Sequence, residues 1–216
     1  MTKVHPNVVS AAASADTAAR VEEKGEAVSL TVWRRSLLFN GKGFTVFDGA
    51  GDLVFRVETY AGGSSRQVVL MDADGRALLT VRRKKLSLAD EWIIYDGDAA
   101  TPSSPAPKRF TARRHVSLRP TKSLAHLSPA RAPAGGAAAA APSCRYDVEG
   151  SYAGRCLDVF ASPSSASAGD ERRRVASVCR KEAAVGPDVF RLVVEPGFEP
   201  PLAMAVVILL DQMHAS

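Results

Sequence analysis

An uninterrupted run of apolar residues at 202–210 follows Pro200 and Pro201 in this chain of 216 residues. A proline fits the first helical position because its missing N–H would have no partner there. A helix without a polar face must be buried on every side or lie in lipid. The run is far shorter than the ~20 residues that a bilayer-spanning helix needs. It therefore predicts a helix enclosed by the rest of the protein.

Most of the preceding chain has the pattern of β-strands. Apolar and polar residues alternate at 28–33 and 53–58, as in strands with one buried face. Segments 47–57 and 71–81 each join an Asp/Gly turn to a strand, which is typical of hairpins. We expect further strands near 92–95, 110–118, 146–148, 156–160, 175–178 and 189–194. About twelve strands and one fully buried helix predict a mainly β fold, a closed antiparallel barrel with the helix inside.

Two segments lack this periodicity. Residues 1–27 are rich in alanine, serine and charge, and we expect a disordered N-terminal tail. Residues 128–143 contain prolines, glycines and a run of alanines, which is typical of a low-complexity insertion. The sequence thus predicts a single barrel domain over residues 28–213 with an insertion at 128–143. Whether the insertion contributes a strand is left open.

The overall charge and the cysteines restrict the class of protein. A formal net charge of +5 favours an anionic partner such as a phospholipid surface or nucleic acid. The three cysteines have no C-x-x-C spacing, which argues against a disulfide framework and a zinc site. The first residues lack the apolar segment of a secretory signal. We therefore expect a protein that is not secreted but cytoplasmic, with peripheral plasma-membrane and nuclear locations as alternatives.

Several short segments, in the same order along the chain, resemble those of the plant LURP-one-related (LOR) family, whose fold is like the tubby C-terminal domain. They are residues 3–6, 31–33, 40–44, 47–57, 81–88, 148–150 and 205–211. The resemblance implies a barrel threaded by a central hydrophobic helix. It also implies kinship with tubby-like proteins and phospholipid scramblases, and so membrane tethering and transcriptional regulation. Some family members are linked to plant pathogen defence.

A basic run at 82–85 is the sharpest local feature. Tubby domains bind phosphoinositide head groups through basic side chains, and the resemblance makes this run the candidate equivalent. The basic residues at 108–109 and 113–114 are expected to add to the same patch. Each such residue near an anionic leaflet contributes about 1 kcal/mol. The alternative is a solvated basic edge that prevents strand-to-strand aggregation. The candidate lipid-binding residues are Arg82, Arg83, Lys84, Lys85, Lys108 and Arg109.

Other motifs predict no catalytic, cofactor or metal site. An EF-hand loop needs glycine at its sixth position and glutamate at its twelfth, so residues 72–75 predict a turn rather than a calcium site. The four histidines are scattered without ligand spacing, and no G-x-S-x-G occurs. We therefore expect a protein that is not an enzyme and needs no cofactor.

Three functions remain open from the sequence. The first is a phosphoinositide-binding, membrane-tethered regulator, and the second is a protein-interaction scaffold in plant defence or stress signalling. The third is a scramblase-like lipid transporter, which the short apolar run disfavours. The expected partners are a phosphoinositide membrane surface and an unidentified protein. We expect no direct nucleic-acid binding, and a monomer.

Overall fold

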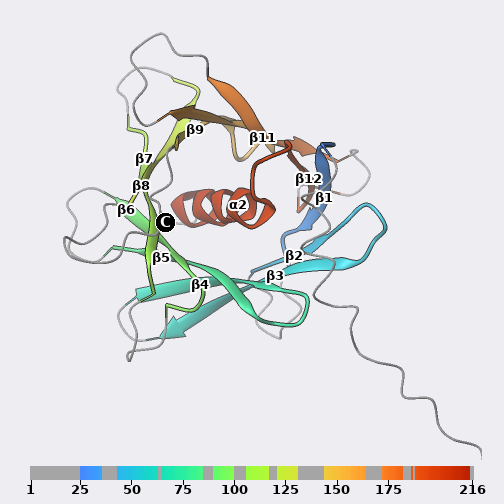
Figure 1. The fold of residues 1–216 in the computed structure, drawn as a ribbon, viewed down its shortest axis with the longest axis horizontal. Helices are drawn as coiled ribbons and strands as arrows, with labels where there is room; N and C mark the ends of the chain where they lie inside the picture. The colour runs from blue at the N-terminus through green and yellow to red at the C-terminus, as the bar shows by residue number, and fades with distance from the viewer. Residues whose placement is uncertain are drawn as a thin grey trace, which may run out of the picture.

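The computed structural model describes residues 25–35, 43–62, 65–84, 90–99, 106–116, 121–130, 144–163, 172–181, 186 and 188–214. Twelve antiparallel strands in these ranges close into one barrel around helix α2 (Pro200–His214). Figure 1 shows α2 inside the ring of strands. The predicted fold class, a mainly β closed barrel around a C-terminal hydrophobic helix, is confirmed.

Each strand pairs with the next one along the chain, and β12 pairs with β1 to close the barrel. The strands are β1 (Val28–Trp33), β2 (Gly43–Phe47), β3 (Leu53–Gly62), β4 (Ser65–Asp72), β5 (Ala77–Arg83), β6 (Glu91–Asp96), β7 (Lys108–Arg114), β8 (Ser123–Pro129), β9 (Cys144–Ser151), β10 (Cys156–Pro163), β11 (Arg173–Arg180) and β12 (Val189–Val194).

The structure changes some of the expected boundaries. Strand β8 was not predicted, and its last two residues, Ser128 and Pro129, fall inside the expected insertion. Strand β7 ends at Arg114 rather than near residue 118. Residues 131–143 and 1–24 lie outside the described residues. The part of the insertion that the structure describes therefore belongs to the barrel.

Aspartates form the hairpin turns that the repeat predicted. The Asp48 Oδ1 atom accepts hydrogen bonds from the backbone N–H groups of Ala50 and Asp52, both at 2.9 Å. Asp72 Oδ1 accepts one from Arg76 at 2.8 Å, and Gly75 between them has a φ of +89°. Glycine adopts this backbone conformation without steric cost. Residues 72–75 are a turn, as expected.

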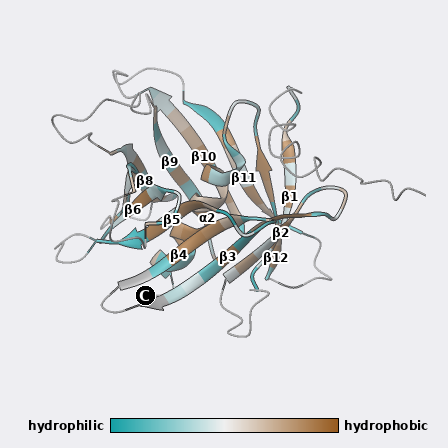
Figure 2. Cartoon of the chain, turned by 60° about the horizontal axis from the view of Figure 1, so that its bottom comes forward, coloured by the Kyte–Doolittle hydropathy of each residue, from teal (hydrophilic) through white to brown (hydrophobic). Residues whose placement is uncertain are grey.

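The core consists of the inward-facing strand residues and nearly the whole of α2. Every residue from 202 to 210 is buried, and Figure 2 shows hydrophobic colour along α2. Full burial of one Val, Leu or Ile side chain stabilises a fold by roughly 1.5–3 kcal/mol. The helix therefore supplies the centre of the core, as its apolar sequence requires.

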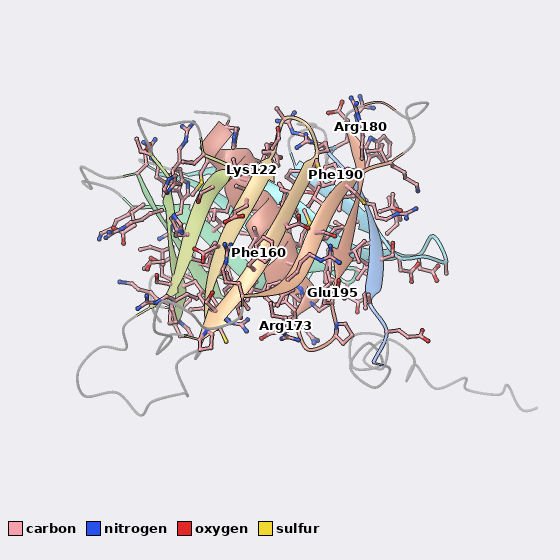
Figure 3. The ribbon with its side chains drawn as sticks, turned by 90° about the horizontal axis from the view of Figure 1, so that it is seen from above. Lys122, Phe160, Arg173, Arg180, Phe190 and Glu195 are labelled. Carbon is pink, nitrogen blue, oxygen red and sulfur yellow. The ribbon has the colours of Figure 1, made fainter. Side chains whose placement is uncertain are left out.

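The alternating strand directions divide the barrel into two rims. Odd-numbered strands end, and even-numbered strands begin, at the rim where α2 also ends; we call it rim C. The opposite rim, where α2 begins, is rim N. Figure 3 shows Lys122 and Arg180 toward one rim and Arg173 and Glu195 toward the other. A residue's position on its strand thus decides which rim it joins.

Candidate anion-binding rim

The described basic residues at the end of β5 lie at rim C, where acidic neighbours pair with two of them. Arg83 Nη2 forms an ion pair with Asp90 Oδ1, and the Arg83 guanidinium lies 5.6 Å from the centre of the Trp92 ring. Lys84 Nζ lies 3.2 Å from Glu91 Oε2. Lys85 lies outside the described residues. These contacts reduce the charge that Arg83 and Lys84 present to a ligand.

Arg82 has a different environment because its side chain lies along the outer face of the sheet. Its Nη2 donates to Gln67 Oε1 at 2.5 Å and to the Ala99 carbonyl at 3.2 Å. The guanidinium also lies 5.8 Å from the Tyr95 ring centre. Arg82 therefore connects β4 and β6 to the loop after β6, a structural role that leaves it half-buried.

Lys108 and Arg109 lie at rim N, at the opposite end of the strands from Arg83. Arg109 contacts Asp96 Oδ1 at 3.6 Å and also pairs with Glu199. Burial raises the pKa of Asp96 above its ordinary value, and Arg109 offsets only part of this effect. The structure does not bring Lys108 and Arg109 together with the β5 residues.

Other cations join the β5 residues at rim C instead. Arg113 in β7 lies opposite Glu91 in the register, with Arg113 Nη2 3.7 Å from Glu91 Oε2. Arg114 and Lys122 are exposed, and no ion pair holds either of them within the described ranges. The sequence predicted that Arg113 and Arg114 add to the basic run. It did not predict Lys122 there, because strand β8, which Lys122 precedes, was not recognised.

The β11–β1 side of rim C is also cationic. Arg35 and Arg180 are exposed and have no ion pair among the described residues, and Lys181 Nζ donates to Thr31 Oγ1 at 3.2 Å. Arg34 Nε binds Asp211 Oδ1 at 2.9 Å. Partial burial opposes the charge of Arg34, but Asp211 and its neighbours more than offset this, so its pKa is raised. Cations therefore occupy two separate sides of the same rim.

Asp211 fixes the end of α2 to the barrel wall. Its Oδ1 atom accepts a second hydrogen bond, from the Tyr152 hydroxyl at 3.0 Å. Burial raises the pKa of Tyr152, and the nearby Asp211 carboxylate raises it further. The hydroxyl therefore stays protonated and continues to donate at physiological pH. This network gives rim C a rigid centre.

The exposed large hydrophobic residues of the described chain lie at rim C as well. They are Trp33 at the end of β1, Tyr60 near the end of β3 and Val116 after β7, exposed by 37%, 49% and 85%. The Arg35 guanidinium lies 5.7 Å from the Trp33 ring centre. Sequence periodicity cannot reveal this grouping, because the three residues come from distant strands.

Rim N has a different charge distribution. Its hairpin turns carry aspartates, which offset its cations, and some of these form ion pairs: Arg174 contacts Glu195 at 3.3 Å and Asp158 at 3.8 Å. The acidic residues near this rim are Asp48, Asp52, Asp72, Asp74, Asp96, Glu195 and Glu199. The two rims therefore differ in both net charge and exposed apolar surface.

Larger metal clusters and membrane-spanning helices are absent from the described residues. No group of three or more His, Cys, Asp or Glu side chains in them is placed to hold a metal ion. No disulfide joins Cys144, Cys156 or Cys179 in the described part of the chain. Among the helices of the described part, none is long and apolar enough to cross a membrane.

Comparison with known proteins gives consistent matches over nearly the whole chain. The family model described as LURP-one-related matches residues 28–211. The Arabidopsis thaliana protein LURP-one-related 8 is 42% identical, covering 100% of both chains, and LURP-one-related 17 is 37% identical, covering 88% of this chain and 85% of its own. An X-ray structure of an A. thaliana protein has the same fold, with a TM-score of 0.58 at 19% identity over 88% of this chain and 93% of its own.

Proposed function

The chain belongs to the LURP-one-related family, and from the composition of rim C we propose that it is a non-enzymatic protein that docks this rim on an anionic, phosphoinositide-containing membrane. The observation that carries the proposal is that one rim groups the exposed large hydrophobic side chains with cations that outnumber the acidic residues there. The kinship with tubby-like proteins and phospholipid scramblases that the sequence resemblance implied belongs to the same proposal. The proposal places the protein as a peripheral protein at the cytoplasmic face of a membrane.

The physical argument joins two forces. Trp and Tyr side chains have an apolar body and a polar tip, so they favour the head-group layer of a bilayer. Each Lys or Arg near an anionic leaflet adds about 1 kcal/mol. Rim C presents both kinds of side chain outward, whereas the aspartate-rich turns of rim N would be repelled by the same surface. The residues expected to contact lipid are Trp33, Arg35, Tyr60, Arg114, Val116, Lys122 and Arg180.

The basic run at 82–85, which the sequence predicted as the lipid site, contributes less to membrane docking than the other cations of rim C. Arg83 and Lys84 lie at the docking rim, but each would have to exchange an acidic partner for a lipid phosphate. An exposed ion pair such as Arg83–Asp90 is worth only about 0–1 kcal/mol, so Arg83 can exchange its partner at a small free-energy cost. Glu91 is buried, so the loss of Lys84 would leave its carboxylate with Arg113 at 3.7 Å, and Lys84 contributes less to lipid binding.

Liposome flotation with a matched pair of variants tests the proposal. The rim C variant replaces Arg35, Arg114, Lys122 and Arg180 by glutamine, and vesicles contain phosphatidylcholine alone or with phosphatidylserine or phosphoinositide. Four lost contacts of about 1 kcal/mol each predict a loss of affinity on the order of 100- to 1000-fold. Binding should also weaken with salt, because ionic screening acts over about 8 Å at physiological ionic strength.

A control variant removes the same charge from rim N. It replaces Arg76, Lys108, Arg145 and Arg173 by glutamine, all of them exposed, and should retain wild-type flotation. An equal loss of vesicle binding in both variants would show that binding depends only on the net charge of the protein, and it would contradict docking through rim C. A wild-type protein that ignores anionic vesicles even at low salt would overturn lipid binding, and the scaffold in defence or stress signalling would take its place.

A further inference from the structure

Two histidines that are distant in sequence lie side by side on the outer wall near rim C. The register of β7 with β8 pairs Arg113 with His126, and the His115 N–H continues the ladder to the Leu124 carbonyl at 2.9 Å. This places His115 Nδ1 2.9 Å from His126 Nε2, with the ring centres 5.1 Å apart. Nothing in the spacing of the histidines along the chain indicates this proximity.

A carboxylate orients one of the two rings. Asp147 in β9 lies opposite His126 in the register, and its Oδ1 lies 2.5 Å from His126 Nδ1. The Nδ1–H of His126 donates to this carboxylate, which leaves the lone pair of Nε2 directed at His115. Metal-binding histidines in proteins commonly have this second contact, which fixes the tautomer and increases the basicity of the ligating nitrogen.

From this geometry we propose that His115 Nδ1 and His126 Nε2 form a binding site for a divalent transition-metal ion of the zinc or copper class. Zinc–nitrogen bonds of about 2.0–2.1 Å with tetrahedral angles place two nitrogens roughly 3.3 Å apart. The observed 2.9 Å reaches this value through a small rotation of the two rings. Without the metal, His115 Nδ1–H donates to His126 Nε2. When the metal binds, this proton moves to His115 Nε2, so that the lone pairs of His115 Nδ1 and His126 Nε2 both point at the metal.

The surroundings fit an exposed site of moderate affinity. The His126 side chain is 45% exposed and that of Asp147 is 28% exposed, so water can fill the remaining coordination positions. Ser123 Oγ, 3.4 Å from His126 Nε2, is a further oxygen close to the metal position. Imidazole nitrogens select zinc, copper and nickel over calcium and magnesium, which prefer oxygen ligands. The positive charge of the neighbouring Arg113 repels a bound metal cation, but the carboxylates of Glu91 and Asp147 offset this repulsion.

Equilibrium titration of the full-length protein with Zn²⁺ tests this site. All proteins carry Cys144, Cys156 and Cys179 replaced by serine, so that thiols cannot bind the metal. We expect one Zn²⁺ to bind per chain in this background. His115→Ala and His126→Ala should each abolish saturable binding, and His214→Ala should leave it unchanged.

The Asp147 carboxylate provides a second test, because its loss should matter only if it orients His126 for metal binding. Asp147→Asn should weaken zinc binding by about 10- to 100-fold, as in other sites that lose such a partner, while circular dichroism stays that of the parent. Lack of saturable binding up to about 1 mM Zn²⁺, or binding that survives His126→Ala, would overturn the proposal. Neither outcome depends on whether rim C binds lipid, since the titration contains no vesicles.

Discussion

Replacing Val207 by aspartate should abolish stable folding at neutral pH, and acid should partly restore stability. Val207 is 1% exposed and lies in the middle of α2, inside the barrel. Burial without a partner raises a carboxyl pKa by up to about 3–5 units, and each unit corresponds to 1.36 kcal/mol. At about pH 7 the cost is limited to the ~3 units between the unfolded pKa of about 3.9 and pH 7, which is roughly 4 kcal/mol.

This cost is close to the lower end of the stability of a typical domain, about 5–15 kcal/mol. The lost valine packing adds to it, since burying one such side chain contributes roughly 1.5–3 kcal/mol. The pH dependence follows from the sign of the shift. The folded-state pKa of the new carboxyl lies above its unfolded value, so the penalty is present at neutral pH and disappears below about pH 4. The free energy of unfolding should therefore rise as the pH falls from about 7 toward 4.

Urea unfolding followed by circular dichroism, with Val207→Thr and Val207→Ala as companions, measures these effects. Threonine keeps the shape of valine, and its hydroxyl can bond to the carbonyl four residues earlier, so we expect a loss of about 1–3 kcal/mol. Alanine should cost about 1.5–3 kcal/mol, and neither companion should acquire the new pH dependence. The companions keep the test informative if the aspartate variant is insoluble. An aspartate variant with the wild-type melting temperature, or an alanine variant within about 0.5 kcal/mol of wild type, would refute the enclosure of α2.

Three further outcomes are expected. Gly150→Ala should destabilise the barrel by at least about 2 kcal/mol in urea unfolding. The φ of Gly150 is +126°, and a Cβ atom there would lie 2.4 Å from the Cys156 carbonyl oxygen. Gly49→Ala is the matched control, because a Cβ atom at Gly49 would have open space around it. Asp96→Asn should slightly raise the free energy of unfolding near pH 7, since burial raises the Asp96 pKa and disfavours its charge, and the gain should vanish near pH 3 in the same assay. Replacing residues 131–143 by a short Gly/Ser linker should shift the melting temperature by only a few degrees, and a collapse of stability in calorimetry would show that the segment contributes to the core.

The sequence alone determined the most local and the most hydrophobic features of the protein. The run at 202–210 has no polar face, so it required enclosure whatever surrounded it. The aspartates and glycines at 48–52 and 72–75 determined two hairpin turns because their own side chains and backbone freedom form the turn. These signals need no knowledge of the rest of the chain, and together they predicted the barrel.

Only the tertiary structure decided how charged residues group. A period of two assigns a residue to a face of its strand, but it gives neither the partner strand nor the rim that the residue joins. The register therefore separated Arg109 from Arg83 and placed acidic partners beside both. It also brought His115 and His126 together across a hairpin whose second strand, β8, has too weak an apolar pattern to be recognised. Strand pairing is set by closure of the whole barrel, which no single segment encodes.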